Sequence, residues 1–200
     1  MRLVFFLVTG LAFAQSNRPK LPGEDWQILF NGKDLSGWSN VGNEKWTVEK
    51  GGVLRGVAVS KAYGYLRTDK NYKDFQLSMH FKCVGEGNSG VFFHSEFKPG
   101  TSDITQGLQF EIDCSLGKHT GGLYGDGRNW IVWPAPENEG VVRREEWNEY
   151  LLIVEGNRYR SRLNGVWLVD FTDPSPKSFD GGISLQLHPA ARAICNSKKS

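Results

Sequence analysis

The feature that most constrains the fold of this chain is the periodicity of its apolar residues. No long stretch repeats apolar residues about every three to four positions, as an amphipathic helix does. The chain instead contains short runs of alternating polar and apolar residues, separated by turns rich in glycine and asparagine. Asn164-Gly165 is a typical hairpin turn, because both residues tolerate a positive φ. Many short strands joined by such turns predict an all-β protein, an antiparallel β-sandwich or jelly roll. We expect strands over residues 26–30, 46–49, 53–56, 75–83, 89–94, 107–114, 147–155, 158–163, 166–171 and 182–187.

The first residues are typical of a secretory signal peptide. Arg2 precedes an apolar run, Leu3–Leu11, that is too short to span a bilayer, and Ala12-Phe13-Ala14 fits a cleavage site. An uncleaved N-terminal anchor is the alternative interpretation. We therefore predict an exported protein, periplasmic or extracellular, whose mature chain contains no membrane span.

The length of 200 residues suits one sizeable β domain. We assign residues 1–14 to the signal peptide, 15–24 to a flexible lead-in, 25–189 to a single β-sandwich domain and 190–200 to an atypical polar tail. Basic and acidic residues nearly balance, 24 against 22, and neither sign forms a long run, which argues against nucleic acid as a partner. The tryptophans, 7 in all, suit a packed core or a sugar-binding surface, because indole rings stack on pyranose faces.

The chain has three cysteines, Cys83, Cys114 and Cys195. An oxidising compartment permits one disulfide and leaves one thiol over. Cys83 and Cys114 each end a predicted strand and could pair, whereas two buried free thiols are the alternative. None of the pairs has the spacing of a zinc site.

Two predicted strands carry polar side chains suited to chemistry on one of their faces. Alternation puts Gln109, Glu111 and Asp113 on one face, while the apolar residues between them belong to the core. Gln186 and His188 share a face of the last strand in the same way. Such amide, carboxylate and imidazole groups can bind sugar hydroxyls, transfer protons or ligate a hard cation. If these strands are neighbours of the strand that ends at His94 and of an arginine-bearing strand, one sheet face presents these five side chains together with His94 and some of the arginines.

Further candidates lie on other strands and in one loop. His94 ends the predicted strand 89–94, and Arg162 belongs to a series of alternating arginines. The apolar loop 130–136 contains Trp133, which could stack over a sugar, and Arg128 lies just before it. The alternative explanation is that these polar residues do not form a site. Ordinary strands with one buried face also alternate apolar residues with polar residues that face solvent.

Several segments together resemble the 3-keto-disaccharide hydrolase domain family, long described as a domain of unknown function. Their matches span nearly the whole predicted mature chain. The segments are Leu29-Phe30-Asn31-Gly32-Lys33-Asp34-Leu35-Ser36-Gly37-Trp38, Trp46-Thr47-Val48-Glu49, Asn88-Ser89-Gly90-Val91-Phe92-Phe93, Gln109-Phe110-Glu111-Ile112-Asp113, Thr120-Gly121-Gly122-Leu123-Tyr124-Gly125, Glu146-Trp147-Asn148-Glu149-Tyr150, Leu163-Asn164-Gly165-Val166 and Gly182-Ile183-Ser184-Leu185-Gln186-Leu187-His188.

The resemblance implies a concanavalin A-like lectin/glucanase fold, carbohydrate as the ligand and cleavage of glycosides oxidised at C3. A ketone at C3 acidifies the proton at C2, so a base can remove that proton, the C1 substituent leaves and water adds. On this interpretation Glu111 or Asp113 is the base, and His94 or His188 is the acid. An arginine or a divalent cation would stabilise the enolate. The expected substrate-binding residues are Gln109, Gln186, Arg128, Trp133 and Arg162.

A non-catalytic, lectin-like carbohydrate-binding module is the alternative, because a fold does not determine an activity. Laminarinase-type β-glucanases share the fold but place paired carboxylates on one strand, with the pattern E-x-D-x-x-E. Here Glu111-Ile112-Asp113 continues into Cys114 without a second glutamate, which argues against that mechanism. Relatives often carry an acidic residue where Gln109 stands, glutamine where Glu111 stands and arginine where His94 stands. Relatives also continue into a final strand where this chain has its polar tail.

Overall fold

The computed structural model describes residues 26–85, 87–114 and 119–189, and their regular secondary structure is almost entirely β. The predicted signal peptide, lead-in and polar tail lie outside the described residues. The strands are β1 (Trp38–Val41), β2 (Lys45–Glu49), β3 (Val53–Val57), β4 (Gly64–Tyr72), β5 (Phe75–Phe81), β6 (Asn88–Phe97), β7 (Ile104–Asp113), β8 (Leu123–Gly125), β9 (Trp130–Val132), β10 (Asn148–Glu155), β11 (Arg158–Leu163), β12 (Val166–Thr172) and β13 (Gly181–Leu187), and the one described helix is the 3-10 helix η1 (Pro136–Val141).

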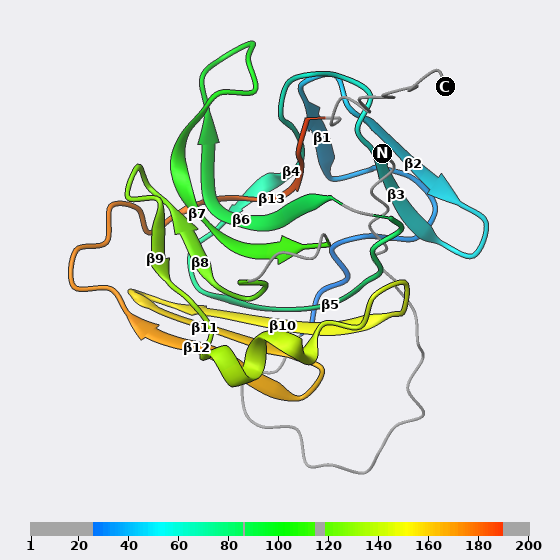
Figure 1. The fold of residues 1–200 in the computed structure, drawn as a ribbon. Coiled ribbons are helices and arrows are strands. Elements are labelled where there is room, and N and C mark those ends of the chain that lie inside the picture. The colour runs from blue at the N-terminus through cyan, green and yellow to red at the C-terminus, as the bar shows by residue number, and fades with distance from the viewer. Residues whose placement is uncertain (1–25, 86, 115–118, 190–200) are drawn as a thin grey trace, which may run out of the picture.

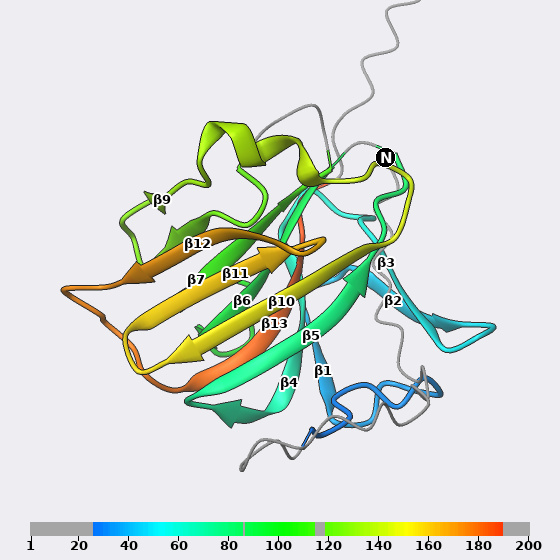
Figure 2. The same ribbon diagram turned by 90° about the horizontal axis from the view of Figure 1, so that it is seen from below.

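Eleven of these strands form two stacked antiparallel sheets, which confirms the predicted β-sandwich, and β2 and β3 pair in a separate two-stranded sheet (Figure 1). The larger sheet has seven strands in the order β1-β4-β13-β6-β7-β8-β9, and the smaller has four in the order β12-β11-β10-β5. Figure 2 shows the smaller sheet lying across the larger, with the hairpin β2–β3 projecting from one side. Among the described residues, no helix is long and apolar enough to cross a membrane.

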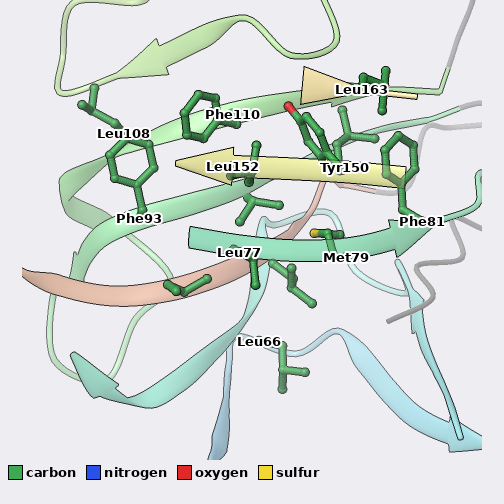
Figure 3. Close-up of a cluster of buried hydrophobic side chains, with 14 of the residues drawn as sticks. Leu66, Leu77, Met79, Phe81, Phe93, Leu108, Phe110, Tyr150, Leu152 and Leu163 are labelled. Atoms are coloured by element: carbon green, nitrogen blue, oxygen red, sulfur yellow. The ribbon is translucent and has the colours of Figure 1, made fainter. Parts of the chain in front are cut away.

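The core lies between the two sheets and is built by the alternation that the sequence shows. Phe93 of β6 and Phe110 of β7 point inward from the larger sheet, and Tyr150 and Leu152 of β10 meet them from the smaller (Figure 3). Because one face of each strand is buried here, every second residue of β7 is forced onto the opposite face of the larger sheet. The core therefore fixes which way Gln109, Glu111 and Asp113 point.

A disulfide joins Cys83, which follows β5, to Cys114, which follows β7. Of the two possibilities for this pair, the structure therefore shows the bridge and not two free thiols. Because β5 and β7 belong to different sheets, the bond ties the sheets together at the end of the strand that carries Glu111 and Asp113.

Some predicted elements differ from the structure. Residues 26–30 form no strand, although Phe30 is fully buried. The loop expected at 130–136 contains the edge strand β9, and β4 occupies an inner position in the larger sheet although the sequence analysis did not predict it. Charged residues such as Asp69 and Lys70, which are exposed in the second half of β4, mask its alternation.

Candidate functional site

A cavity of about 550 Å³ lies on the face of the larger sheet that points away from the core. Its volume is in the range of small-molecule binding sites. Strands β4, β13, β6, β7, β8 and β9 all contribute, together with the β6–β7 loop. The lining residues are Tyr63, Tyr65, Asn88, Phe92, Ser102, Asp103, Ile104, Gln109, Glu111, Tyr124, Trp130, Gln186 and His188.

The strand register explains why side chains distant in sequence meet here. Gln186 pairs with Tyr65 across β13 and β4, and Gly90 pairs with Glu111 across β6 and β7. Because β13 and β6 are also neighbours, these positions lie on one continuous sheet face. Glu111 and His188 line the same cavity, although β7 and β13 are not neighbours and lie on either side of β6.

Glu111 is held in the cavity floor between two amide side chains. Its exposed fraction is 4 %, its Oε2 accepts a hydrogen bond from Gln109 Nε2 at 2.7 Å, and its Oε1 accepts one from Asn88 Nδ2. Burial raises the pKa of Glu111 to about 8, with a further contribution from the charge of Asp113 and against the opposing effect of the Asn88 hydrogen bond. At neutral pH Glu111 is therefore mainly a protonated acid.

His188 also lines the cavity and is half-buried. The ring of Tyr63 meets its imidazole edge-on, with ring centroids 4.7 Å apart. Burial lowers the pKa of His188 below its usual value of 6.5, while the charge of Asp113 acts in the opposite direction. At neutral pH the imidazole is therefore uncharged and can accept a proton.

Two buried amide oxygens of the cavity have no hydrogen-bond partner among the described residues. They are Gln186 Oε1 and Asn88 Oδ1. The Gln186 side chain is held from its other end, where Nε2 approaches the Tyr65 hydroxyl at 3.4 Å. Because buried polar atoms in proteins are nearly always paired, these acceptors indicate a ligand that supplies donors, as sugar hydroxyls do.

Gly90 makes room for the Gln109 side chain that contacts Glu111. A Cβ at position 90 would lie 2.2 Å from Gln109 Nε2 and 2.5 Å from its Cδ. Gln109 Nε2 also donates to the Ser89 carbonyl at 3.1 Å, so the amide is fixed at two points. The glycine is therefore needed for the hydrogen bonding of Glu111.

Replacing Gly90 by alanine is expected to lower activity on a carbohydrate substrate by at least about tenfold, because a shift of roughly 1 Å in a reacting group is enough to do so. The Gln109 side chain can move away, so the protein should still fold. Gly140→Ala is the matched control, since a Cβ there meets no atom within 4 Å. Equal kcat values for the two variants would contradict this function of Gly90.

Aromatic side chains form the remaining walls of the cavity. Tyr124 and Trp130 contact each other edge-to-face, with centroids 5.5 Å apart, and Tyr65 packs in the same manner on Phe92 at 5.6 Å. Rings fixed in this way can stack against the apolar face of a sugar while the central amides bind its hydroxyls. These aromatic residues and Asn88 were absent from the predicted site, because finding them requires the strand register.

His94 does not reach the cavity, contrary to the prediction. Its ring is fully buried, with Nδ1 3.2 Å from the Ser178 carbonyl oxygen and Nε2 2.8 Å from that of Lys73. A positive φ of 51° at an irregularity in β6 turns its side chain out of the alternating pattern. The structure thus places His94 as a link between backbone segments, and not beside Glu111.

The two predicted substrate-binding arginines also lie elsewhere. Arg162 is on the smaller sheet, where it pairs with Glu149 at 3.5 Å. Arg128 forms an ion pair with Asp173 at 2.7 Å. Neither arginine lines the cavity, whereas the predicted residues Gln109 and Gln186 do.

Two further predicted residues lie beside the cavity. Asp113 pairs with Asn88 in the register and affects the pKa of both Glu111 and His188. Trp133 is 56 % exposed and stacks on His119 outside the cavity. Among the described residues, no group of three or more His, Cys, Asp or Glu side chains lies close enough together to hold a metal ion.

Comparisons with known proteins agree with this geometry. A family model described as "3-keto-alpha-glucoside-1,2-lyase-like domain" matches residues 25–194. A 3-keto-disaccharide hydrolase of Bacteroides thetaiotaomicron is 32 % identical over 95 residues, which cover 42 % of this chain and 33 % of that protein. The match thus spans about a third of the length of this relative.

Solved structures share the fold at low sequence identity. A candidate glycosyl hydrolase of Parabacteroides distasonis has a TM-score of 0.63 at 24 % identity, covering 82 % of this chain and 88 % of that one. A β-glucanase of Bacillus licheniformis has a TM-score of 0.55 at 18 % identity, covering 82 % and 84 %. The predicted lectin/glucanase type of β-sandwich is therefore confirmed.

Proposed function

Since the chain belongs to the 3-keto-alpha-glucoside-1,2-lyase-like domain family, we propose that it is an exported enzyme that cleaves glycosides carrying a ketone at C3. One observation within the structure supports this most directly. A buried, protonated Glu111 and an uncharged His188 line the same cavity, and that cavity also contains unpartnered acceptors for hydroxyl groups. Such a pair can donate and accept protons at neutral pH.

The proposed reaction begins with removal of the acidic C2 proton by His188, because its lowered pKa keeps the imidazole free to accept. The electrons form a C1–C2 double bond as the bond between C1 and the glycosidic oxygen breaks. Glu111 donates its proton to that oxygen, so the leaving group departs as a neutral alcohol. Addition of water to the double bond then gives the hydrolysis product.

These roles exchange the ones expected from the sequence, in which the carboxylate was the base and the histidine the acid. Burial is the physical cause, because it disfavours the charged form of both groups. Asp113 supports the assignment, since its charge makes His188 a stronger base and helps keep Glu111 protonated.

The proposal is tested by incubating the protein with a 3-keto-glucoside and with its unoxidised parent, each with and without a chelator. Release of the aglycone from the keto compound alone, unaffected by the chelator, is the expected result. Binding of both sugars without turnover would instead show a lectin-like binding module. Equal cleavage of both compounds would contradict a mechanism that needs an acidic C2 proton.

The pH dependence follows from the same two groups. We expect kcat/KM to rise as His188 loses its proton below pH 6.5 and to fall near pH 8 as Glu111 ionises. A pH profile between about 4 and 10 on the 3-keto-glucoside measures both limbs. A rate that keeps increasing through pH 8 would mean that Glu111 acts as a carboxylate base, as first expected.

The disulfide supports the proposed location outside the cytoplasm, because such bonds persist mainly in oxidising compartments. Cell fractionation of the producing organism, with thiol labelling of Cys83 and Cys114, tests it. Recovery of the protein in the cytoplasm with both thiols reduced would contradict export.

A further inference from the structure

An exposed aromatic cluster continues outward from the cavity along its β9 wall. Trp130 lines the cavity, and Trp133 lies next to it, with ring centroids 6.4 Å apart and planes at 79°. Trp133 is 56 % exposed, although it is a large apolar side chain. We propose that Trp133 forms an outer subsite that stacks on a second sugar ring, the leaving group of the glycoside bound in the cavity.

One face of the Trp133 ring is covered by a stacked imidazole. The imidazole of His119 stacks on it nearly parallel, with centroids 4.4 Å apart and an interplanar angle of 7°. Because Trp133 stays more than half exposed while His119 covers one of its faces, the opposite face is directed to solvent. A flat indole face of this kind is what the apolar face of a pyranose binds.

The supporting imidazole is itself held in place. His119 Nδ1 lies 2.8 Å from Glu139 Oε1, and the edge of its ring contacts Trp130 with centroids 5.1 Å apart. His119, Trp130 and Trp133 therefore form one connected set that is anchored to β9 and η1. An ordered platform binds a ligand with a smaller loss of side-chain entropy than a mobile tryptophan would.

The position of the platform fits a linked second ring. β9 is two strands from β7, which at the usual strand spacing is roughly 10 Å from the strand that carries Glu111. Glu111 is the proposed donor to the glycosidic oxygen, so the leaving group must extend from the Glu111 side of the cavity. Tyr124 and Trp130 line the path from there to Trp133.

This inference rests on the proposed function and is tested with two substrates, a 3-keto disaccharide and the methyl 3-keto-glucoside. Trp133→Ala should raise KM for the disaccharide about tenfold, in the range of ring-stacking contributions, and leave the methyl glucoside unchanged. Trp167→Ala is the matched control, because Trp167 is 45 % exposed on the smaller sheet. An equal effect of Trp133→Ala on both substrates would show a purely structural role and overturn the subsite.

His119 is a positioning residue in this scheme. His119→Phe, which keeps a flat ring behind Trp133, should retain the low KM for the disaccharide, whereas His119→Ala should raise it. Calorimetric titration with the unoxidised disaccharide separates the two proposals: binding weakened by Trp133→Ala supports the subsite even where no keto compound is cleaved. Unchanged binding and unchanged KM in Trp133→Ala would overturn it.

Discussion

Glu111→Gln is expected to lower kcat on an alkyl 3-keto-glucoside by about 10²- to 10⁴-fold, the usual contribution of a general acid. Glutamine has the shape of the protonated carboxyl group but holds no acidic proton. Its amide can still accept from Gln109, and it can donate to Asn88 Oδ1, an acceptor that is otherwise without a partner among the described residues. The cavity should therefore keep its form while proton donation is lost.

The leaving group decides whether Glu111 is the acid. A 4-nitrophenyl 3-keto-glucoside releases a stable phenolate and needs no proton, so Glu111→Gln should cleave it nearly as fast as the unmodified protein. His188→Gln should be impaired on both substrates, because C2 deprotonation is required in either case. If Glu111→Gln is equally impaired on both substrates, Glu111 is the base and the assignment proposed above is wrong.

The same substitution is expected to stabilise the folded protein at neutral pH. The folded state holds the Glu111 proton up to a pKa of about 8, whereas the unfolded chain releases it near the ordinary value of 4.5. The stability of the unmodified protein should therefore fall between these pH values, by roughly 3 kcal/mol at pH 7. Glu111→Gln removes this loss, since glutamine does not titrate.

Urea unfolding at about pH 4 and pH 7 measures the effect. The variant and the unmodified protein should have similar midpoints in acid and differ at neutral pH, with the variant more stable. Glu149→Gln is the control, because Glu149 is exposed on the smaller sheet. A variant that is less stable at pH 7 would show that the ionised carboxylate is well solvated in the folded protein.

The sequence predicts the chemistry of single strands better than the assembly of the site. Alternation along residues 107–114 correctly separates Glu111 from the core, because one face of that strand is buried. Alternation fails at His94, where an irregular register turns the side chain toward backbone carbonyls. A local pattern contains no information about such a bulge, which is set by contacts with neighbouring strands.

The cavity walls could not be predicted for a related reason. Tyr65 reaches the site through pairing between β4 and β13, which are more than a hundred residues apart in the chain. Trp130 reaches it because β8 and β9 extend the sheet beyond β7. Neither pairing leaves a signal in a single sequence, whereas the family resemblance identifies the strands without giving their neighbours.

Arg128→Ala is expected to lower the free energy of unfolding by about 3–5 kcal/mol, because it leaves a buried charge without its partner. Arg128 Nη1 and Nη2 donate to the two carboxylate oxygens of Asp173 at 3.0 and 2.7 Å, and Asp173 is fully buried. Arg128 follows β8 on the larger sheet and Asp173 follows β12 on the smaller, so the pair ties the sheets together. The residue predicted to bind substrate is thus expected to act on stability.

The neighbouring charges decide the pH range of this effect. The Arg128 hydrogen bonds lower the pKa of Asp173 below 3.8, so the stabilisation is present above that pH and is lost as the pH falls through the lowered value. Asp126 also approaches the guanidinium, at 3.4 Å. Thermal unfolding of Arg128→Ala should therefore differ most from that of the unmodified protein at neutral pH.

Two further variants show that the loss comes from the orphaned carboxylate. Arg158→Ala removes a two-pronged pair with Asp170 whose side chains are 48 % and 51 % exposed, so a much smaller change is expected. Arg128→Met combined with Asp173→Asn removes both charges together, and should be more stable than Arg128→Ala because no buried charge is left unpaired. If the double variant is as unstable as Arg128→Ala, the contact between the sheets depends on the ion pair itself and not on avoiding an unpaired buried charge.

If Arg128→Ala unfolds like the unmodified protein but fails to bind sugar, Arg128 binds substrate as the sequence predicted, and its assignment to stability is wrong.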